Sequence, residues 1–162
     1  MVVGRQPYVL RRFEEGNGDQ VIVLLHGLGG THRYWTCGPI SFALPGYRRV
    51  LVDLLGFGRS PRPWMRYTLE RHLAALDLTL AGERQITLVG HSLGAALALA
   101  YAARWPDRIS RLVLISPPCF QWIAGAAAWF ARQRGGWVYT SLWATAIACI
   151  IARRIAGRLL PR

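Results

Sequence analysis

The sequence lacks lysine altogether and has few acidic residues. Its 20 basic residues are all arginine, against eight aspartates and glutamates, which gives a formal net charge of +12. A basic chain can bind nucleic acid or anionic membranes. Here the arginines occur singly or in pairs, with no longer basic cluster and no nucleic-acid motif. The sequence therefore predicts no nucleic-acid binding.

Cysteine is also scarce. Cys37, Cys119 and Cys149 are odd in number and far apart, which favours small buried thiols in a reducing compartment over a disulfide framework. No metal-ligand spacing is present, so we expect neither a metal nor another cofactor. The first residues lack an apolar core long enough for a signal peptide, and we expect a cytoplasmic protein.

The most informative stretch covers residues 88–100. An apolar run leads into Gly90-His91-Ser92-Leu93-Gly94 and continues as an alanine- and leucine-rich segment, which reads as strand, turn and helix. Glycines on both sides of Ser92 allow a turn too crowded for a Cβ atom. Ser92 then lies exposed at the tip, where the Leu93 amide can point at an oxygen held beside it. This pattern predicts a nucleophile elbow.

The rest of residues 1–118 alternates between strand and helix patterns. Apolar runs typical of strands buried on both faces occupy residues 20–25, 48–53, 86–89 and 111–116. A helix is predicted from an N-cap at Thr68 to near Gly82, and the helix after Ser92 runs to about Trp105. This alternation predicts an α/β fold with a mostly parallel sheet flanked by helices.

An edge strand is predicted before these elements. Residues 8–14 have strand-forming composition and are followed by a turn at residues 16–19. One interpretation is a hairpin between residues 8–14 and 20–25.

At this point the chain resembles the α/β-hydrolase family over residues 8–118. The motifs that carry the resemblance are residues 26–29, 53–60, 90–94 and 105–115, in the expected order. The resemblance implies that Ser92 is the nucleophile and that the amides of Leu28 and Leu93 form the oxyanion hole. An aspartate nucleophile, as in dehalogenase-like members, is excluded by the serine. A small-molecule ester or similar acyl substrate, hydrolysed through an acyl-enzyme, is the leading expectation.

Further roles follow from the same resemblance. It implies that His26, Gly27 and Asp53 shape the loops around the site, with Asp53 capping nearby backbone and Arg59. Three loop aromatics, Trp35, Phe57 and Trp64, are candidates either to line an apolar pocket or to anchor their loops.

The sequence departs from the family pattern at the base and the acid. The family order is serine, then an acid, then histidine. No histidine follows Ser92, and the last acidic residue, Asp107, lies in a connection toward the opposite end of the sheet. Without a base a serine hydroxyl is a weak nucleophile, so we expect this chain alone to be nearly inactive.

Each of the four histidines has a structural interpretation. We expect His26 to orient the oxyanion loop, and His91 to lie beside the elbow and point away from the serine. His72 is expected on a solvated or half-buried helix position. His32 is the one candidate for a replacement base.

Residues 119–162 differ in composition from the rest. They contain no acid, and residues 136–152 carry no charge. Two interpretations remain: helices of a cap over the active site, or a membrane-associated helix near the minimum length for crossing a bilayer. We therefore expect two segments, 1–118 as the N-terminal part of an α/β-hydrolase core and 119–162 as a cap-like or membrane-associating segment.

Two function classes follow. The first is a serine hydrolase, present as a truncated or partial chain that lacks the triad acid and histidine. The second is a non-catalytic hydrolase-like binding module, with membrane association as an open alternative. If the chain is a truncated hydrolase, its incomplete sheet would leave an unpaired strand edge, and self-association is expected.

Overall fold

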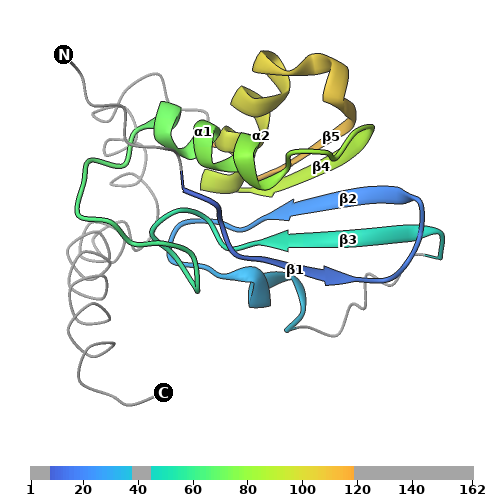
Figure 1. Ribbon diagram of the computed structural model, residues 1–162, viewed down its shortest axis with the longest axis horizontal. Coiled ribbons are helices and arrows are strands. Elements are labelled where there is room, and N and C mark those ends of the chain that lie inside the picture. The colour runs from blue at the N-terminus through green and yellow to red at the C-terminus, as the bar shows by residue number, and fades with distance from the viewer. Residues whose placement is uncertain (1–7, 38–44, 119–162) are drawn as a thin grey trace, which may run out of the picture. The chain divides into compact units, whose positions relative to one another are not determined.

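A computed structural model describes residues 8–37 and 45–118, which form a five-stranded sheet with two α-helices (Figure 1). The strands are β1 (Arg12–Glu15), β2 (Gln20–Leu25), β3 (Tyr47–Val52), β4 (Ile86–His91) and β5 (Ile109–Ile115). Their order is β1-β3-β2-β4-β5, and all neighbours are parallel except β1 and β3. The predicted α/β class with a mostly parallel sheet is confirmed.

The helices follow the predicted positions closely. They are α1 (Leu69–Thr79) and α2 (Leu93–Arg104), with short 3-10 helices η1 (His32–Trp35) and η2 (Pro106–Arg108). The Thr68 hydroxyl accepts a hydrogen bond from the Arg71 amide, which confirms Thr68 as the N-cap of α1. Asp107 lies in η2, in the connection that leads into the start of β5, as expected.

No helix in residues 8–37 and 45–118 has the length and apolar character needed to cross a bilayer. The segment 136–152, for which cap and membrane interpretations remain open, lies outside the described residues.

Both faces of β2 are buried, which explains its unbroken apolar sequence. Val21, Val23 and Leu25 belong to the main core cluster with residues of α1 and α2. Ile22 and Leu24 belong to a second cluster that includes Trp35 of η1. Because successive strand residues point to opposite faces, a sheet covered on both sides requires apolar residues at every position.

The hairpin interpretation of the first two strands is wrong. β1 pairs antiparallel with β3, with Arg12 opposite Val52, and β3 lies between β1 and β2 (Figure 1). The connection from β1 therefore passes the start of β3, where the Gln20 amide donates to the Gly46 carbonyl. Pairing with β3 lets β1 cover the edge of a buried strand that would otherwise present unpaired amides and carbonyls.

A closed ring of charges joins the turn before β4 to β1 and β3. Arg12 contacts Glu14 and Glu83, and Arg48 contacts the same two carboxylates at 2.7 Å each. The Glu83 side chain is largely buried. Each charge therefore has two opposite partners, an arrangement that stabilises more than an isolated surface pair.

The backbone of α2 lies very close to the backbones of β4 and β2. A Cβ atom on Gly90 would lie 2.3 Å from the Gly94 carbonyl oxygen, and one on Gly94 would lie 2.3 Å from the Leu25 carbonyl oxygen. Neither backbone can move away without breaking the sheet or the helix. Only glycine fits at these two positions, as the sequence predicted.

His72 is more buried than the sequence indicated. The expectation was a solvated or half-buried helix residue, but the side chain is only 6% exposed, and its Nδ1 atom has no hydrogen-bond partner among the described residues. α1 packs this face against the main core, with Leu73 and Leu76 nearby in the sequence. Burial lowers the pKa of His72 because the imidazolium loses its hydration.

We predict that Gly90→Ala strongly destabilises the chain. The added methyl overlaps backbone of α2, and overpacking of this kind costs about 1–3 kcal/mol or more. Gly29→Ala is the control, because a Cβ there meets nothing within 4 Å and the change carries only the strain of a positive φ. Urea denaturation of both variants is the measurement. Equal losses for the two variants would contradict the packing argument.

We predict that His72→Leu preserves stability at pH 7.5 and reduces the loss of stability in acid. The folded-state pKa of His72 lies below its ordinary value of 6.5, so its contribution is present above pH 6.5 and is lost as pH falls through the folded pKa. The free energies of unfolding of wild type and variant should therefore diverge in the variant's favour between pH 7.5 and pH 5. A constant difference across that range would show that His72 ionises equally in both states.

Candidate active site

Ser92 lies at the turn between β4 and α2 in a backbone conformation that residues other than glycine rarely adopt. Its φ is 50° and its ψ is −113°. Its amide donates to the Ile115 carbonyl at 2.9 Å, and its carbonyl accepts the Ala95 amide at the start of α2. This is the unusual backbone expected for Ser92. Hydrogen bonds from β5 and α2 hold it there, since a conformation of this kind persists only where its surroundings fix it.

The loop after β2 lies directly beside Ser92. A Cβ atom on Gly27 would lie 3.3 Å from the Ser92 Cβ and 2.8 Å from His91 Nδ1. Leu28, the next residue, is 54% exposed, and Leu93 is the first residue of α2. The fold thus brings the two predicted oxyanion-hole residues to the same end of the sheet as Ser92, while their role stays a prediction.

His26 connects the loops after β2 and β3 and is fully buried. Its Nε2 accepts the Leu54 amide at 3.0 Å, and its Nδ1 lies 2.8 Å from the Gly27 carbonyl. An amide can only donate, so the proton of the neutral ring is on Nδ1. Burial lowers the pKa of His26, although the Gly27 carbonyl and Asp53 act in the opposite direction. Both ring nitrogens are therefore engaged in holding backbone.

Asp53 lies fully buried after β3, where it binds two loops at once. One carboxylate oxygen accepts the His32 amide at 2.6 Å and lies 3.0 Å from His32 Nδ1. The other accepts the Arg59 amide at 2.7 Å. The predicted contact with Arg59 is thus made to its backbone. A buried carboxylate needs such donors, because unpaired burial of a charge is costly.

The His32 contact was not foreseen, because residues 32 and 53 have no sequence spacing that links them. The His32 ring also stacks on Phe13 at 3.6 Å, and this places His32 against β1 as well. Its Nδ1 is engaged by Asp53, so a base function would have to use Nε2. The replacement-base role stays a prediction.

His91 precedes Ser92 and carries the other contact that the sequence did not indicate. Its ring stacks on Tyr34 at 4.7 Å, and its Nδ1 has no hydrogen-bond partner among the described residues. This nitrogen faces the loop after β2, because a Cβ atom on Gly27 would lie 2.8 Å from it. Tyr34 of η1 therefore covers the strand end next to the elbow.

The three loop aromatics do not form the expected pocket. Trp35 is buried in the second cluster beneath the sheet, while Phe57 packs on the main core and lies 5.7 Å from His26. Trp64 is 85% exposed. The prediction for Trp35 was wrong because η1 covers the sheet face opposite the two α-helices. The position of Trp35 in a loop of the sequence does not reveal which face that loop covers.

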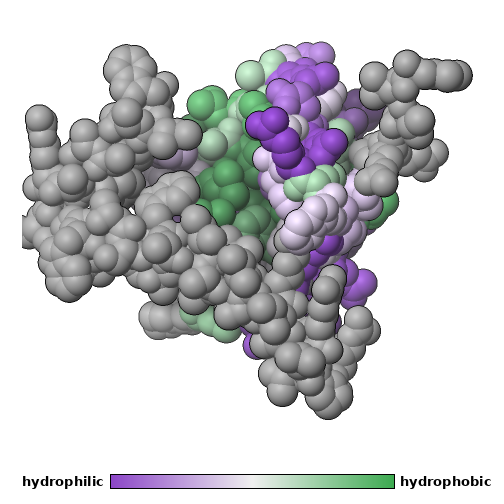
Figure 2. Space-filling view, turned by 90° about the vertical axis from the view of Figure 1, so that its left-hand side faces the viewer, coloured by the Kyte–Doolittle hydropathy of each residue, from purple (hydrophilic) through white to green (hydrophobic). Residues whose placement is uncertain are grey.

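Figure 2 looks onto the side toward which β2 and β3 point in Figure 1. Hydrophobic side chains are gathered in the middle of this view, next to a strongly polar area. The exposed Leu28 side chain belongs to the loop at this end of the sheet.

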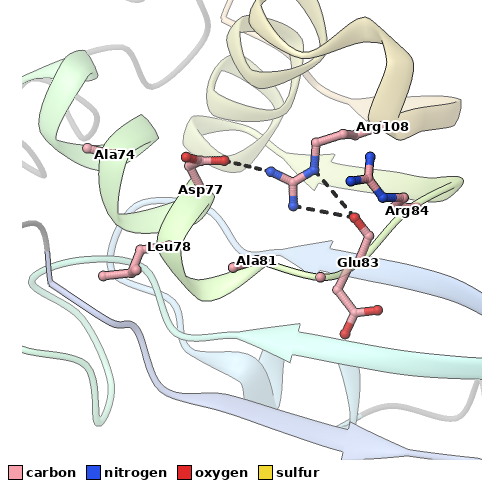
Figure 3. A pocket seen from close by; sticks show the side chains of 8 residues that line it. Ala74, Asp77, Leu78, Ala81, Glu83, Arg84 and Arg108 are labelled. Atoms are coloured by element: carbon pink, nitrogen blue, oxygen red, sulfur yellow. Dashed lines mark hydrogen bonds and ion pairs between the residues drawn. The ribbon is translucent and has the colours of Figure 1, made fainter.

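A hollow lined by the end of α1 and by Arg108 lies elsewhere, at the turn that leads into β4 (Figure 3). The Arg108 guanidinium donates to Asp77 at 2.6 Å and to the carbonyls of Leu80 and Glu83. It therefore closes the carboxyl end of α1, where orphan carbonyls need donors. No group of three His, Cys, Asp or Glu side chains in the described ranges is placed to hold a metal ion.

Known proteins are similar to this chain over much of its length. A probable lysophospholipase of Arabidopsis thaliana, BODYGUARD 2, is 36% identical over 108 residues, which are 62% of this chain and 23% of that protein. The chain thus spans about a quarter of the length of this curated relative.

Solved structures of other proteins are also similar to this chain. A thioesterase domain from the curacin biosynthetic pathway is 31% identical with a TM-score of 0.62, covering 72% of this chain and 46% of that one. A haloalkane dehalogenase from Agrobacterium tumefaciens C58 is 28% identical with a TM-score of 0.61, covering 78% and 46%. The sequence profile of the alpha/beta hydrolase fold matches residues 20–142, and the chain belongs to that family.

Proposed function

We propose that the chain carries the nucleophile and the oxyanion hole of a serine hydrolase that cleaves acyl esters through an acyl-enzyme. The observation that supports this most is the conformation of Ser92 at the turn from β4 to α2, with φ at 50°. A serine in an ordinary strand or helix needs no such backbone. Strain of this kind gathers at functional sites, where it presents a reactive group.

In the proposed reaction, the Ser92 hydroxyl oxygen attacks the ester carbonyl carbon while its proton passes to a base. The carbonyl oxygen becomes an oxyanion and accepts hydrogen bonds from the amides of Leu28 and Leu93. The bond to the leaving alcohol then breaks, and the alcohol takes the proton. Water hydrolyses the resulting Ser92 ester by the same steps.

The proposal assigns no base among the described histidines. His26 uses both ring nitrogens to hold backbone, and His32 uses one on Asp53. His72 lies buried on α1, and the His91 ring stacks on Tyr34 with its Nδ1 facing Gly27. No histidine follows Ser92 in this sequence. The loss of a triad member leaves only oxyanion-hole and binding effects, about 10³- to 10⁴-fold over the uncatalysed reaction.

The substrate class follows from the relatives and from the surface beside Ser92. One relative is named a probable lysophospholipase, and a similar structure is a thioesterase domain. Both names point to the cleavage of an acyl bond. The hydrophobic side chains in Figure 2 and the exposed Leu28 would suit an acyl chain.

We predict that a fluorophosphonate probe labels Ser92 slowly but selectively. The elbow and the two amides should favour attack at Ser92 over any other serine by about tenfold or more, while the lack of an assigned base keeps the reaction to hours. Peptide mass spectrometry after timed incubation of the 162-residue chain measures the label at each serine.

Ser92→Ala should abolish the label, whereas Ser110→Ala is the matched control and should leave it unchanged. Ser110 lies in β5 and donates to the Gln85 carbonyl, away from the elbow. Labelling spread evenly over the serines would contradict the proposal and favour a non-catalytic binding module. The same holds if unfolding lowers the labelling of Ser92 no more than that of the other serines. Labelling within seconds would show that the chain contains a base.

A further inference from the structure

The loop between β3 and α1 exposes hydrophobic side chains within a few residues of one another. Trp64 is 85% exposed, the highest value among the large hydrophobic residues that the structure describes. Tyr67 is 39% exposed and Leu69 is 46% exposed. Single exposed hydrophobic residues are ordinary on protein surfaces, whereas exposed hydrophobic residues grouped together indicate an interaction surface. Three of them in six positions make this loop a candidate for one.

The loop is fixed in this arrangement by its own contacts. The Tyr67 hydroxyl donates to the Pro63 carbonyl at 2.9 Å, and this closes a short turn around Trp64. Met65, the next residue, packs against the main core cluster. The Arg71 guanidinium donates to the Arg66 carbonyl at 2.8 Å at the end of the turn. The fold therefore holds Trp64 outward while its neighbour is anchored inside.

The charge of this loop has one sign. Residues 54–69 contain Arg59, Arg62 and Arg66, all exposed, and no aspartate or glutamate. The carboxylate just before them, Asp53, is fully buried and accepts hydrogen bonds from His32 and the Arg59 amide. In the sequence, the nearest exposed carboxylate is Glu70, in the first turn of α1. Three exposed arginines thus lie close in sequence to an exposed tryptophan.

The loop also lies at the end of the sheet that carries Ser92. β3 and β4 run parallel to β2, so the loop after β3 and the turn after β4 leave the same edge. Figure 1 shows the loop reaching outward at the side toward which β2 and β3 point.

We propose that this loop, residues 61–69, binds the surface of an anionic lipid membrane. Tryptophan prefers the boundary between headgroups and acyl chains, where its ring is buried and its N–H stays hydrated. Arg62 and Arg66 contact lipid phosphates on either side of it. Stable binding to membranes usually needs an apolar and a basic element together, and the loop supplies both. This surface is distinct from residues 136–152 and does not depend on the reactivity of Ser92.

Such a surface would present the Ser92 edge to lipid acyl esters, and that consequence rests on the proposed function. The binding itself does not. The two proposals can therefore fail separately.

The test is sedimentation of the 162-residue chain with vesicles of phosphatidylcholine containing about 30 mol% phosphatidylglycerol, compared with pure phosphatidylcholine vesicles. We expect binding to the anionic vesicles that weakens as salt is raised. Trp64→Ala should lower the partition coefficient about tenfold, and Arg66→Gln should lower it about fivefold. Ser92→Ala should bind as the wild type does.

Matched controls remove similar groups elsewhere. Leu99→Ala deletes an exposed apolar side chain on α2, and Arg84→Gln deletes an arginine at the turn before β4. Neither should change binding, and circular dichroism should show all variants folded. Failure to bind anionic vesicles, or equal losses for test and control variants, would overturn the proposal. Binding of single-stranded nucleic acid that is abolished by Trp64→Ala, with no vesicle binding, would overturn it in favour of a nucleic-acid partner.

Discussion

The site depends on how closely β4 and α2 approach each other. Gly90 and Gly94 leave no room for a Cβ atom against the backbone of α2 and β2, so the chain turns from strand to helix within one residue. Ser92 is that residue, and it takes a positive φ because no relaxed conformation connects the two elements at this distance. The conformation of Ser92 is thus a consequence of sheet and helix packing, and not of contacts made by the serine side chain.

Buried polar groups extend this constraint to the neighbouring loops. His26 holds the backbone of Gly27 and Leu54, and Asp53 holds that of His32 and Arg59. Both side chains are completely buried, and an unpaired nitrogen or oxygen there would cost free energy. Both ring nitrogens of His26 and both carboxylate oxygens of Asp53 have hydrogen-bond partners, so the fold avoids this cost. The loops after β2 and β3 are therefore tied to each other next to Ser92.

Much of this could be read from the sequence because the signals are local. The apolar runs, the Thr68 cap and the glycines around Ser92 act within a few residues, and they predicted the strands, α1 and the turn. The pairing of β1 with β3, the burial of His72 and the His32–Asp53 contact depend on which elements meet in space. The sequence also misassigned Trp35, because its burial depends on the sheet face that η1 covers. Residues 119–162 lie outside the described residues, so their two interpretations stay open.

The most direct test of the account compares Ser92→Gly with Ser92→Ala in thermal melts. Glycine normally destabilises a folded position relative to alanine by about 0.5–1 kcal/mol, but it relieves a positive φ that costs a residue with a side chain about 1–3 kcal/mol. Ser92→Gly should therefore melt at least as high as Ser92→Ala, while the pair Ser110→Gly and Ser110→Ala in β5 should show the ordinary order. A Ser92→Gly variant that melts below Ser92→Ala, as at an ordinary position, would contradict the claim that packing of β4 on α2 forces the conformation of Ser92.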